Sequence, residues 1–150
     1  MRLILTTATL IALPFMAFAD DKIEDNVKAR QGFFEMLGAN MAPLAGMAKG
    51  EIAYDEMLAS TSAANIEALT KYTLPMHFVE GSSLKDVKNT AAKSEIWANM
   101  DDFKAKYAAL GEAATGASEA VKGGQANVGP VLGKLGAACK ACHDAYREKQ

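Results

Sequence analysis

The chain has few of the side chains that build metal, redox or disulfide sites. Only two of its 150 residues are cysteine and two are histidine. A structural zinc site usually takes four such ligands, and His77 is far from the other three in sequence, which disfavours zinc. The sequence also lacks the apolar–polar alternation of strands, and it has no low-complexity tract. These absences indicate a helical protein whose chemistry is concentrated in one place.

Residues 1–19 have the pattern of an export signal. Arg2 gives a positive start, an apolar stretch follows, and Ala17-Phe18-Ala19 fits a small-x-small cleavage site. The stretch is short for a membrane span, although a retained N-terminal anchor is the alternative. The sequence therefore predicts cleavage after Ala19, a single domain over residues 20–150 and a periplasmic location.

The predicted mature chain is short of positive charge. Residues 20–150 carry 15 basic and 18 acidic side chains, a net charge of −3 with neutral histidines. Such a surface argues against nucleic acid as a partner, and against an anionic membrane once the signal is removed.

The reactive residues gather near the end of the chain, where Cys139, Cys142 and His143 form the sequence Cys-Lys-Ala-Cys-His. This spacing is typical of c-type haem attachment. On a helix the three residues stand at i, i+3 and i+4 and therefore share one face. Each thiol can add to one haem vinyl group, which leaves the imidazole placed to bind iron as the proximal ligand. The sequence thus predicts one haem c, attached through Cys139 and Cys142, with His143 as the metal ligand.

Two other uses of the cysteine pair stay open. A redox Cys-x-x-Cys normally begins a helix after a strand, whereas this pair follows a helical pattern with no strand before it. A disulfide between cysteines three residues apart demands unusual geometry. Export also suits the haem interpretation, because c-type haem is attached outside the cytoplasm.

Heptad-like spacing of apolar residues predicts four amphipathic helices. A long connection over residues 73–90, with Pro75 and Gly81 among its helix breakers, separates the second from the third. Such helices pack as an all-α, antiparallel, up-down four-helix bundle, with a cofactor between helices near one end. The predicted helices span residues 22–49, 54–72, 91–121 and 127–148. The seam of the first comprises Ile23, Val27, Arg30, Phe34, Leu37, Met41, Leu44 and Ala48.

Three segments carry a resemblance to a known family. Residues 139–147 (Cys-Lys-Ala-Cys-His-Asp-Ala-Tyr-Arg) are similar to the C-terminal signature of the class II c-type cytochromes, and within that class of cytochrome c′. Residues 95–97 (Glu-Ile-Trp), followed by 102–103 (Asp-Phe), look like the third-helix signature, and residues 29–31 (Ala-Arg-Gln) like that of the first helix. The resemblance covers the whole predicted mature chain and implies the four-helix bundle of that family.

The resemblance makes one position decisive for mechanism. In the family, the residue four after the first-helix arginine faces the distal side of the haem; it is a ligating methionine in cytochrome c-556 and an apolar non-ligand in cytochrome c′. Here that residue is Phe34, four after Arg30, and a phenyl ring cannot ligate iron. Met36 points about 200° away round the helix and Met41 lies roughly 10 Å further along its axis. His77 is the remaining candidate for a sixth ligand, in a low-spin electron-transfer cytochrome.

The resemblance also suggests roles for three further residues. Arg30 is expected to pair with a haem propionate, and its place on an apolar seam agrees with this, because a buried charge needs a partner. Arg147 is expected near the proximal His143. Trp97 is expected to touch the haem, with a role in the core as the alternative.

What the resemblance implies about function is a gas-binding haem protein. A five-coordinate iron covered by an apolar ring is expected to bind nitric oxide or carbon monoxide, with some electron transfer to a small redox partner protein. The sequence contains no distal His/Asp pair for peroxidase chemistry, so we expect no enzyme. A haem-free helical interaction protein is the remaining alternative. The family often dimerises through its first two helices, so a homodimer is expected, with Phe33 and Leu74 as exposed apolar residues.

Overall fold

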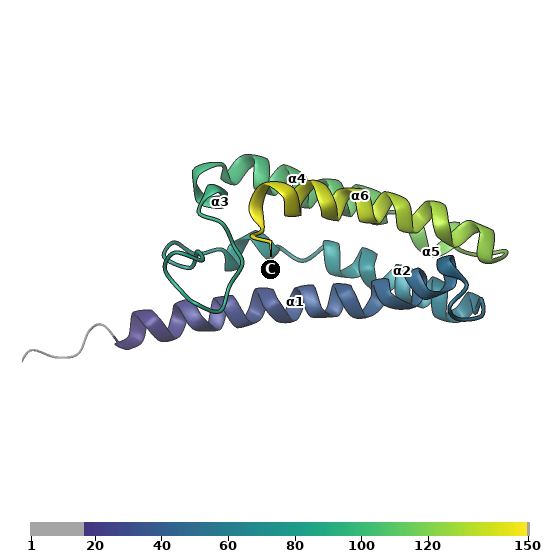
Figure 1. The fold of residues 1–150 in the computed structure, drawn as a ribbon, viewed down its shortest axis with the longest axis horizontal. Coiled ribbons are helices and arrows are strands. Elements are labelled where there is room, and N and C mark those ends of the chain that lie inside the picture. The colour runs from purple at the N-terminus through teal and green to yellow at the C-terminus, as the bar shows by residue number, and fades with distance from the viewer. Residues whose placement is uncertain (1–16, 150) are drawn as a thin grey trace, which may run out of the picture.

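The computed structural model describes residues 17–149, so most of the predicted export signal lies outside the described residues. Four helices of 15 or more residues lie along the long axis of the molecule (Figure 1), with short helical turns between them. The elements are α1 (Ala17–Lys49), α2 (Glu56–Thr70), the 3-10 turn η1 (Leu74–His77), α3 (Glu95–Ala98), α4 (Met100–Ala114), α5 (Ala117–Ala120), the 3-10 turn η2 (Gln125–Asn127) and α6 (Val128–Tyr146).

The long helices form an up-down bundle. Figure 1 shows α1 and α6 running in opposite directions, and the chain reverses again between α2 and α4. Both α1 and α4 pack against α2 and against α6, which closes the ring of four. Within residues 17–149 the only strand-like pairing is an isolated bridge between Ala92 and Arg147. The prediction of an all-α, antiparallel four-helix bundle is confirmed.

The helix ends follow local chemistry. Asp55 caps α2, since its carboxylate accepts a hydrogen bond from the amide of Leu58 at 2.9 Å. Gly50 ends α1 with φ of +73°, a left-handed conformation that costs glycine little. No helix among residues 17–149 is long and apolar enough to span a membrane.

The prediction of one continuous helix over residues 91–121 was wrong. The chain leaves helical geometry at Asn99 (φ −137°, ψ 47°) and again at Gly116, which has φ of +73°. These breaks divide the segment into α3, α4 and α5. Ala92 lies before the first of them, in the bridge to Arg147 rather than in a helix. The apolar spacing continues across both breaks, because α3, α4 and α5 follow one another along the same side of the bundle. The spacing alone therefore does not reveal the breaks.

Two residues expected to be exposed are instead in the core. Phe33 is 3% exposed and Leu74 is 1% exposed. Phe33 lies on the side of α1 that meets Tyr72 and Tyr107, and Leu74 lies in η1 beneath the start of the long connection. Neither residue is therefore available on the surface for contact with a second copy of the chain.

Candidate functional site

The last two turns of α6 carry the three residues that the sequence marked. Cys139 and Cys142 are half-buried free thiols that pack against the hydrophobic core, and His143 is exposed. The α6 helix is continuous through all three, so they lie at i, i+3 and i+4 on one face. The predicted arrangement of two thiols beside one imidazole is therefore built by a regular helix.

The thiols are held in their protonated form. Burial raises the pKa of Cys142 to about 11 and also raises the pKa of Cys139. Redox-active Cys-x-x-Cys pairs have lowered thiol pKa values, commonly at a helix N-terminus. This pair sits near the C-terminal end of α6 instead, so neither its position nor its electrostatics fits a disulfide oxidoreductase.

The imidazole of His143 is held neutral. Burial lowers the pKa of His143, and the positive charge of Arg147 lowers it further. A neutral imidazole is the form that binds metal ions. The structure places Arg147 next to His143. Arg147 also follows the last residue of α6, and its backbone N–H donates to the carbonyl of His143 at 3.0 Å.

The C-terminal end of α6 is fastened to the rest of the bundle. The amide of Lys93 donates to the carbonyl of Tyr146 at 3.0 Å, and the amide of Glu148 donates to the carbonyl of Ala91 at 2.8 Å. The hydroxyl of Tyr146 donates to Asp102 on α4 at 2.6 Å. These bonds fix the orientation of the helical face that carries Cys139, Cys142 and His143.

Arg30 is buried on α1 and is only 2% exposed. Its guanidinium donates to the hydroxyl of Ser82 at 2.8 Å, to the carbonyl of Ser82 at 2.5 Å and to the hydroxyl of Thr90 at 2.8 Å. It also lies 4.7 Å from the ring centroid of Phe78. Burial lowers the pKa of Arg30 to about 10, so it stays charged at neutral pH. No acidic side chain pairs with this buried cation in the part of the chain that the structure describes.

Trp97 contacts Phe78, the same residue that lies against Arg30. Its indole N–H donates to the carbonyl of Phe78 at 3.0 Å, and the two rings lie 6.4 Å apart. Phe78 therefore touches both Arg30 and Trp97, and it also makes an edge-to-face contact with Phe103 at 4.6 Å. Sequence reasoning did not select Phe78, because a lone aromatic in a long connection has no periodicity to mark it.

Phe34 lies on α1, four residues after Arg30, and is 41% exposed. Its ring makes an edge-to-face contact with Phe33 at 5.6 Å. The ring is thus held on one side and open on the other, where it is able to cover a bound group.

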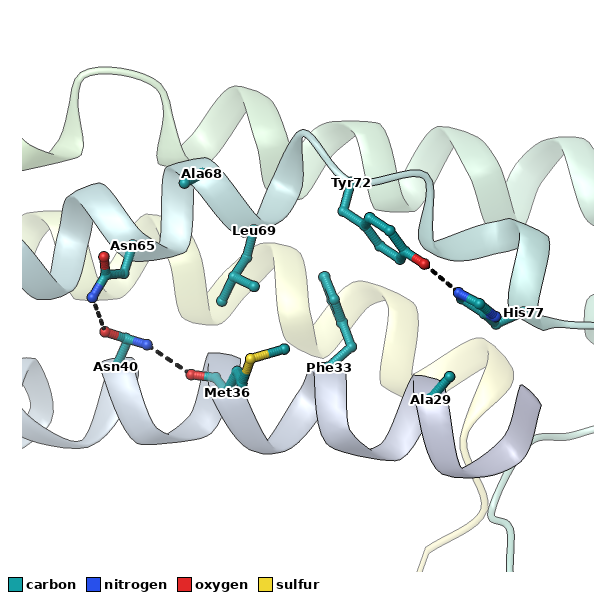
Figure 2. A pocket seen from close by; sticks show the side chains of 9 residues that line it. All are labelled: Ala29, Phe33, Met36, Asn40, Asn65, Ala68, Leu69, Tyr72 and His77. Carbon is teal, nitrogen blue, oxygen red and sulfur yellow. Dashed lines mark hydrogen bonds between the residues drawn. The ribbon is translucent and has the colours of Figure 1, made fainter. Parts of the chain in front are cut away.

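A groove of about 560 Å³ lies between α1 and α2 (Figure 2), and neither cysteine lines it. Met36 and His77 both line it, and these are two of the candidates for a sixth iron ligand. Both ring nitrogens of His77 are engaged, Nε2 with the hydroxyl of Tyr72 and Nδ1 with Asn26 at 2.8 Å. His77, a candidate sixth ligand in the sequence, is therefore held by hydrogen bonds at both ring nitrogens.

The comparison of the sequence with protein families decides the identity. Residues 25–147 match the family described as Cytochrome C′. The chain belongs to the cytochrome c′ family. It is 41% identical to cytochrome c′ of Cereibacter sphaeroides over the full length of both chains. It is also 36% identical to a cytochrome c-556 of Agrobacterium tumefaciens, over 83% of this chain and 98% of that protein.

Solved cytochrome c′ structures have the same fold. A cytochrome c′ from Rhodobacter Spheriodes superposes with a TM-score of 0.82 and 41% identity, covering 85% of this chain and 98% of that one. A nitric oxide complex of a mutant cytochrome c prime from Alcaligenes xylosoxidans gives a TM-score of 0.71 at 29% identity, covering 85% and 97%. Membership of the cytochrome c′ family makes this chain a c-type haem protein.

The residues present fit a haem c. Two free thiols and a neutral imidazole on one helical face are the donors that covalent attachment and proximal ligation need. The buried guanidinium of Arg30 has no acidic partner among the described residues, which suits a propionate. A zinc site fits less well, because no three His, Cys, Asp or Glu side chains converge within the described part of the chain.

Proposed function

We propose that this cytochrome c′ family member is a periplasmic haem protein that binds nitric oxide or carbon monoxide at a five-coordinate iron and also transfers electrons. A haem whose iron has one axial position free binds diatomic gases. The observation that carries the proposal is the ring of Phe34, which stands on α1 four residues after Arg30 and has no ligating atom.

The other candidates for a sixth ligand are engaged elsewhere. His77 uses both ring nitrogens in bonds to Tyr72 and Asn26. Met36 lines the groove between α1 and α2, whereas the cysteines lie on α6. Met41 is partly buried against the core. Recruiting any of them to iron requires contacts to break first.

In this proposal, each residue of the site has a separate role. Cys139 and Cys142 fix the haem edge to α6, and His143 binds the iron in its neutral form. Arg30 supplies a buried positive charge for a propionate. Burial and, after it, the charge of Arg147 lower the pKa of His143. The apolar ring of Phe34 offers no hydrogen bond to bound dioxygen, which favours nitric oxide and carbon monoxide.

The proposed gas binding agrees with what is known of a relative. A mutant of the Alcaligenes xylosoxidans protein, 29% identical to this chain, has been solved as a nitric oxide complex. We therefore assign this chain gas binding and electron transfer rather than an enzymatic reaction.

A homodimer and a small redox partner protein are part of the same proposal. The groove between α1 and α2 has an apolar wall to which Met36 contributes, and Met36 is 50% exposed. We assign this surface to a second copy of the chain. Sedimentation equilibrium of the wild type and of Met36→Lys tests the assignment, because a charge at this position is expected to leave a monomer.

A low-spin electron-transfer cytochrome is the second candidate. It is favoured by the 36% identity to a cytochrome c-556, which spans nearly all of that protein. In this case a side chain other than Phe34 must serve as the sixth iron ligand.

Absorption spectroscopy of the purified haem protein separates the two candidates. The spectra of the ferric and ferrous protein are recorded before and after the addition of carbon monoxide or nitric oxide. Gas binding at a five-coordinate iron gives high-spin spectra that change when gas is added. Sharp low-spin ferrous bands that do not respond to gas would instead identify an electron-transfer cytochrome, and a protein with no Soret band would bind no haem.

A further inference from the structure

Four aromatic side chains form a continuous chain of ring contacts that ends at Phe34. The imidazole of His77 stacks on Tyr72 with 5.6 Å between ring centroids and 17° between ring planes. Tyr72 stacks on Phe33 at 6.0 Å and 29°. Phe33 in turn makes an edge-to-face contact with Phe34 at 5.6 Å. The gas-binding role of Phe34 uses only the last of these rings.

In this series of ring contacts, Tyr72 and His77 are the residues furthest from Phe34, and hydrogen bonds join His77 to α1. Tyr72 and His77 share a hydrogen bond through the tyrosine hydroxyl and Nε2, drawn in Figure 2, and Nδ1 of His77 bonds to Asn26 at 2.8 Å. The guanidinium of Arg30 donates to the carbonyl of His77 at 3.5 Å. Two hydrogen bonds from α1 and the ring contact between Phe33 and Tyr72 thus hold residues 72–77 against the same helix that carries Phe34.

Phe33, the ring next to Phe34, is also contacted from α4. Phe33 also meets Tyr107 of α4, with 6.1 Å between ring centroids. The hydroxyl of Tyr107 donates to the carbonyl of Tyr72 at 2.7 Å, so the same residue fixes both the ring of Phe33 and the backbone of Tyr72. Phe33 is 3% exposed and lines the groove between α1 and α2, whereas Phe34 is 41% exposed. The position of Phe34 therefore depends on a neighbour that is itself clamped between two tyrosines.

We propose that the Tyr72–His77 pair positions Phe34 through Phe33, and thereby sets the rate at which a gas ligand reaches the iron. The proposal rests on the function proposed above, in which Phe34 covers the open side of the iron. Phe34 must move aside before a ligand enters, so whatever holds its ring at rest opposes entry. Tyr72 and His77 are positioning residues in this account, because they act on the ligand only through Phe33 and Phe34.

Removal of the ring of Tyr72 is expected to weaken this hold. Phe33 would then relax toward the groove between α1 and α2, and Phe34 would lose part of its edge-to-face support. One aromatic pair contributes about 0.5–1.5 kcal/mol, so the rate constant for association is expected to rise by roughly two- to tenfold.

Flash photolysis of the carbon monoxide complex of the full-length haem protein measures that rate constant. Tyr72→Leu is expected to raise it by the factor given above. Tyr72→Phe keeps the ring but loses the hydroxyl, so it is expected to recover most of the wild-type rate. Recovery by the ring alone distinguishes positioning from general loosening of the structure.

Tyr54→Leu is the matched control. Tyr54 lies near the opposite end of the bundle, where its hydroxyl donates to the carbonyl of Val121 at 2.9 Å. This variant removes a partly buried tyrosine that makes no contact with Phe33 or Phe34, and it is expected to bind carbon monoxide at the wild-type rate. If Tyr72→Leu does not fold, His77→Leu removes the outermost ring instead and is expected to raise the rate in the same direction.

A readout independent of gas binding accompanies the rates. The nitrogen-15 chemical shifts of the His77 ring report whether Nε2 accepts a hydrogen bond, and Tyr72→Phe is expected to change that shift while keeping the association rate near the wild-type value.

The outcomes separate this inference from the proposed function. A wild-type protein that binds carbon monoxide, with an unchanged rate in Tyr72→Leu, would overturn the inference and leave the function in place. An equal rise in Tyr54→Leu would also overturn it, since the effect would then be global. A wild-type protein that binds no carbon monoxide would remove the function and the inference together.

Discussion

The guanidinium of Arg30 on α1 grips Ser82, which is 52 residues further along the chain, through both its hydroxyl at 2.8 Å and its carbonyl at 2.5 Å. This is how the long connection between α2 and α3 is held, because little of it belongs to a helix. The same side chain lies over Phe78, which receives a hydrogen bond from Trp97. One buried cation thus orders the segment that lies near the C-terminal end of α6 (Figure 1).

Replacement of Arg30 is expected to loosen this connection. Arg30→Met removes the hydrogen bonds to Ser82 and Thr90, while it also removes the cost of burying a charge. We expect the free energy of unfolding to fall by about 2 kcal/mol, the scale of hydrogen bonds to a charged group. Urea denaturation measures the loss, and hydrogen exchange is expected to rise in residues 78–90.

Lys28→Met is the matched control for this change. Lys28 is exposed on the same helix and pairs only with Glu24, at 3.3 Å, so its loss is expected to cost less than about 0.5 kcal/mol. Equal losses from the two substitutions would contradict the anchoring role of Arg30.

Phe34 is expected to decide the spin state of the iron. Phe34→Met places a thioether at the position that the account assigns to the open side of the iron. We expect the absorption spectrum to change from high-spin to low-spin and the affinity for carbon monoxide to fall. Phe34→Leu is the control, because leucine has similar apolar character and no ligating atom, and it is expected to stay high-spin. A high-spin Phe34→Met protein would show that Phe34 does not face the iron.

The first helix shows what the sequence predicted well and where it failed. Val27, Arg30, Leu37 and Leu44 were placed on the inward seam and are buried. Phe33 and Phe34 lie three and four residues after Arg30, and both positions are close to the face of the helix that carries Arg30. Spacing alone therefore allows either residue to be the buried one. The structure buries Phe33 and leaves Phe34 partly open. Only the neighbours of α1, which are distant in sequence, decide between the two.

The functional site was predictable where its residues lie close together in sequence. Cys139, Cys142 and His143 depend on the spacing of one helix, so their shared face follows from the sequence alone. Phe78 and the Arg30–Ser82 bond depend on how a long connection folds back onto α1, and no periodicity encodes that path. The breaks in the third predicted helix were missed for a related reason, because local backbone turns at Asn99 and Gly116 leave the apolar spacing intact.

Tyr146 and Asp102 are expected to give the fold a pH dependence. The hydrogen bond from Tyr146 is the main cause that lowers the pKa of Asp102, with Lys106 adding to it. A carboxyl group with a lowered pKa stabilises the folded state above its unfolded pKa, and this stability is lost as the pH falls through the folded value. We therefore expect Tyr146→Phe to be less stable than the wild type near neutral pH, with a difference that shrinks in acid.

Urea unfolding at about pH 7 and at roughly pH 3, on either side of the ordinary range for aspartate, measures this difference. Asp102→Asn is the companion variant, because it removes the titrating group itself. A Tyr146→Phe deficit that is the same at both pH values would show that the hydroxyl acts without the carboxylate.

We expect one cysteine to be enough for covalent attachment of haem, but with a lower yield than two. Cys139→Ala and Cys142→Ala each leave one thiol for a thioether bond, so each is expected to retain haem on a denaturing gel with reduced yield. The double variant is expected to lose all haem under denaturing conditions. Haem that stays attached in the double variant would contradict thioether linkage through these residues.

The coordination number of the iron tests the central claim most directly. Resonance Raman spectra of the ferrous wild-type protein, recorded without added gas, report whether the iron has five ligands or six. The account predicts five-coordinate, high-spin iron with His143 as the axial ligand from the protein. Six-coordinate, low-spin iron would contradict it, and Met36, Met41 and His77 would then be the residues to replace in search of the sixth ligand.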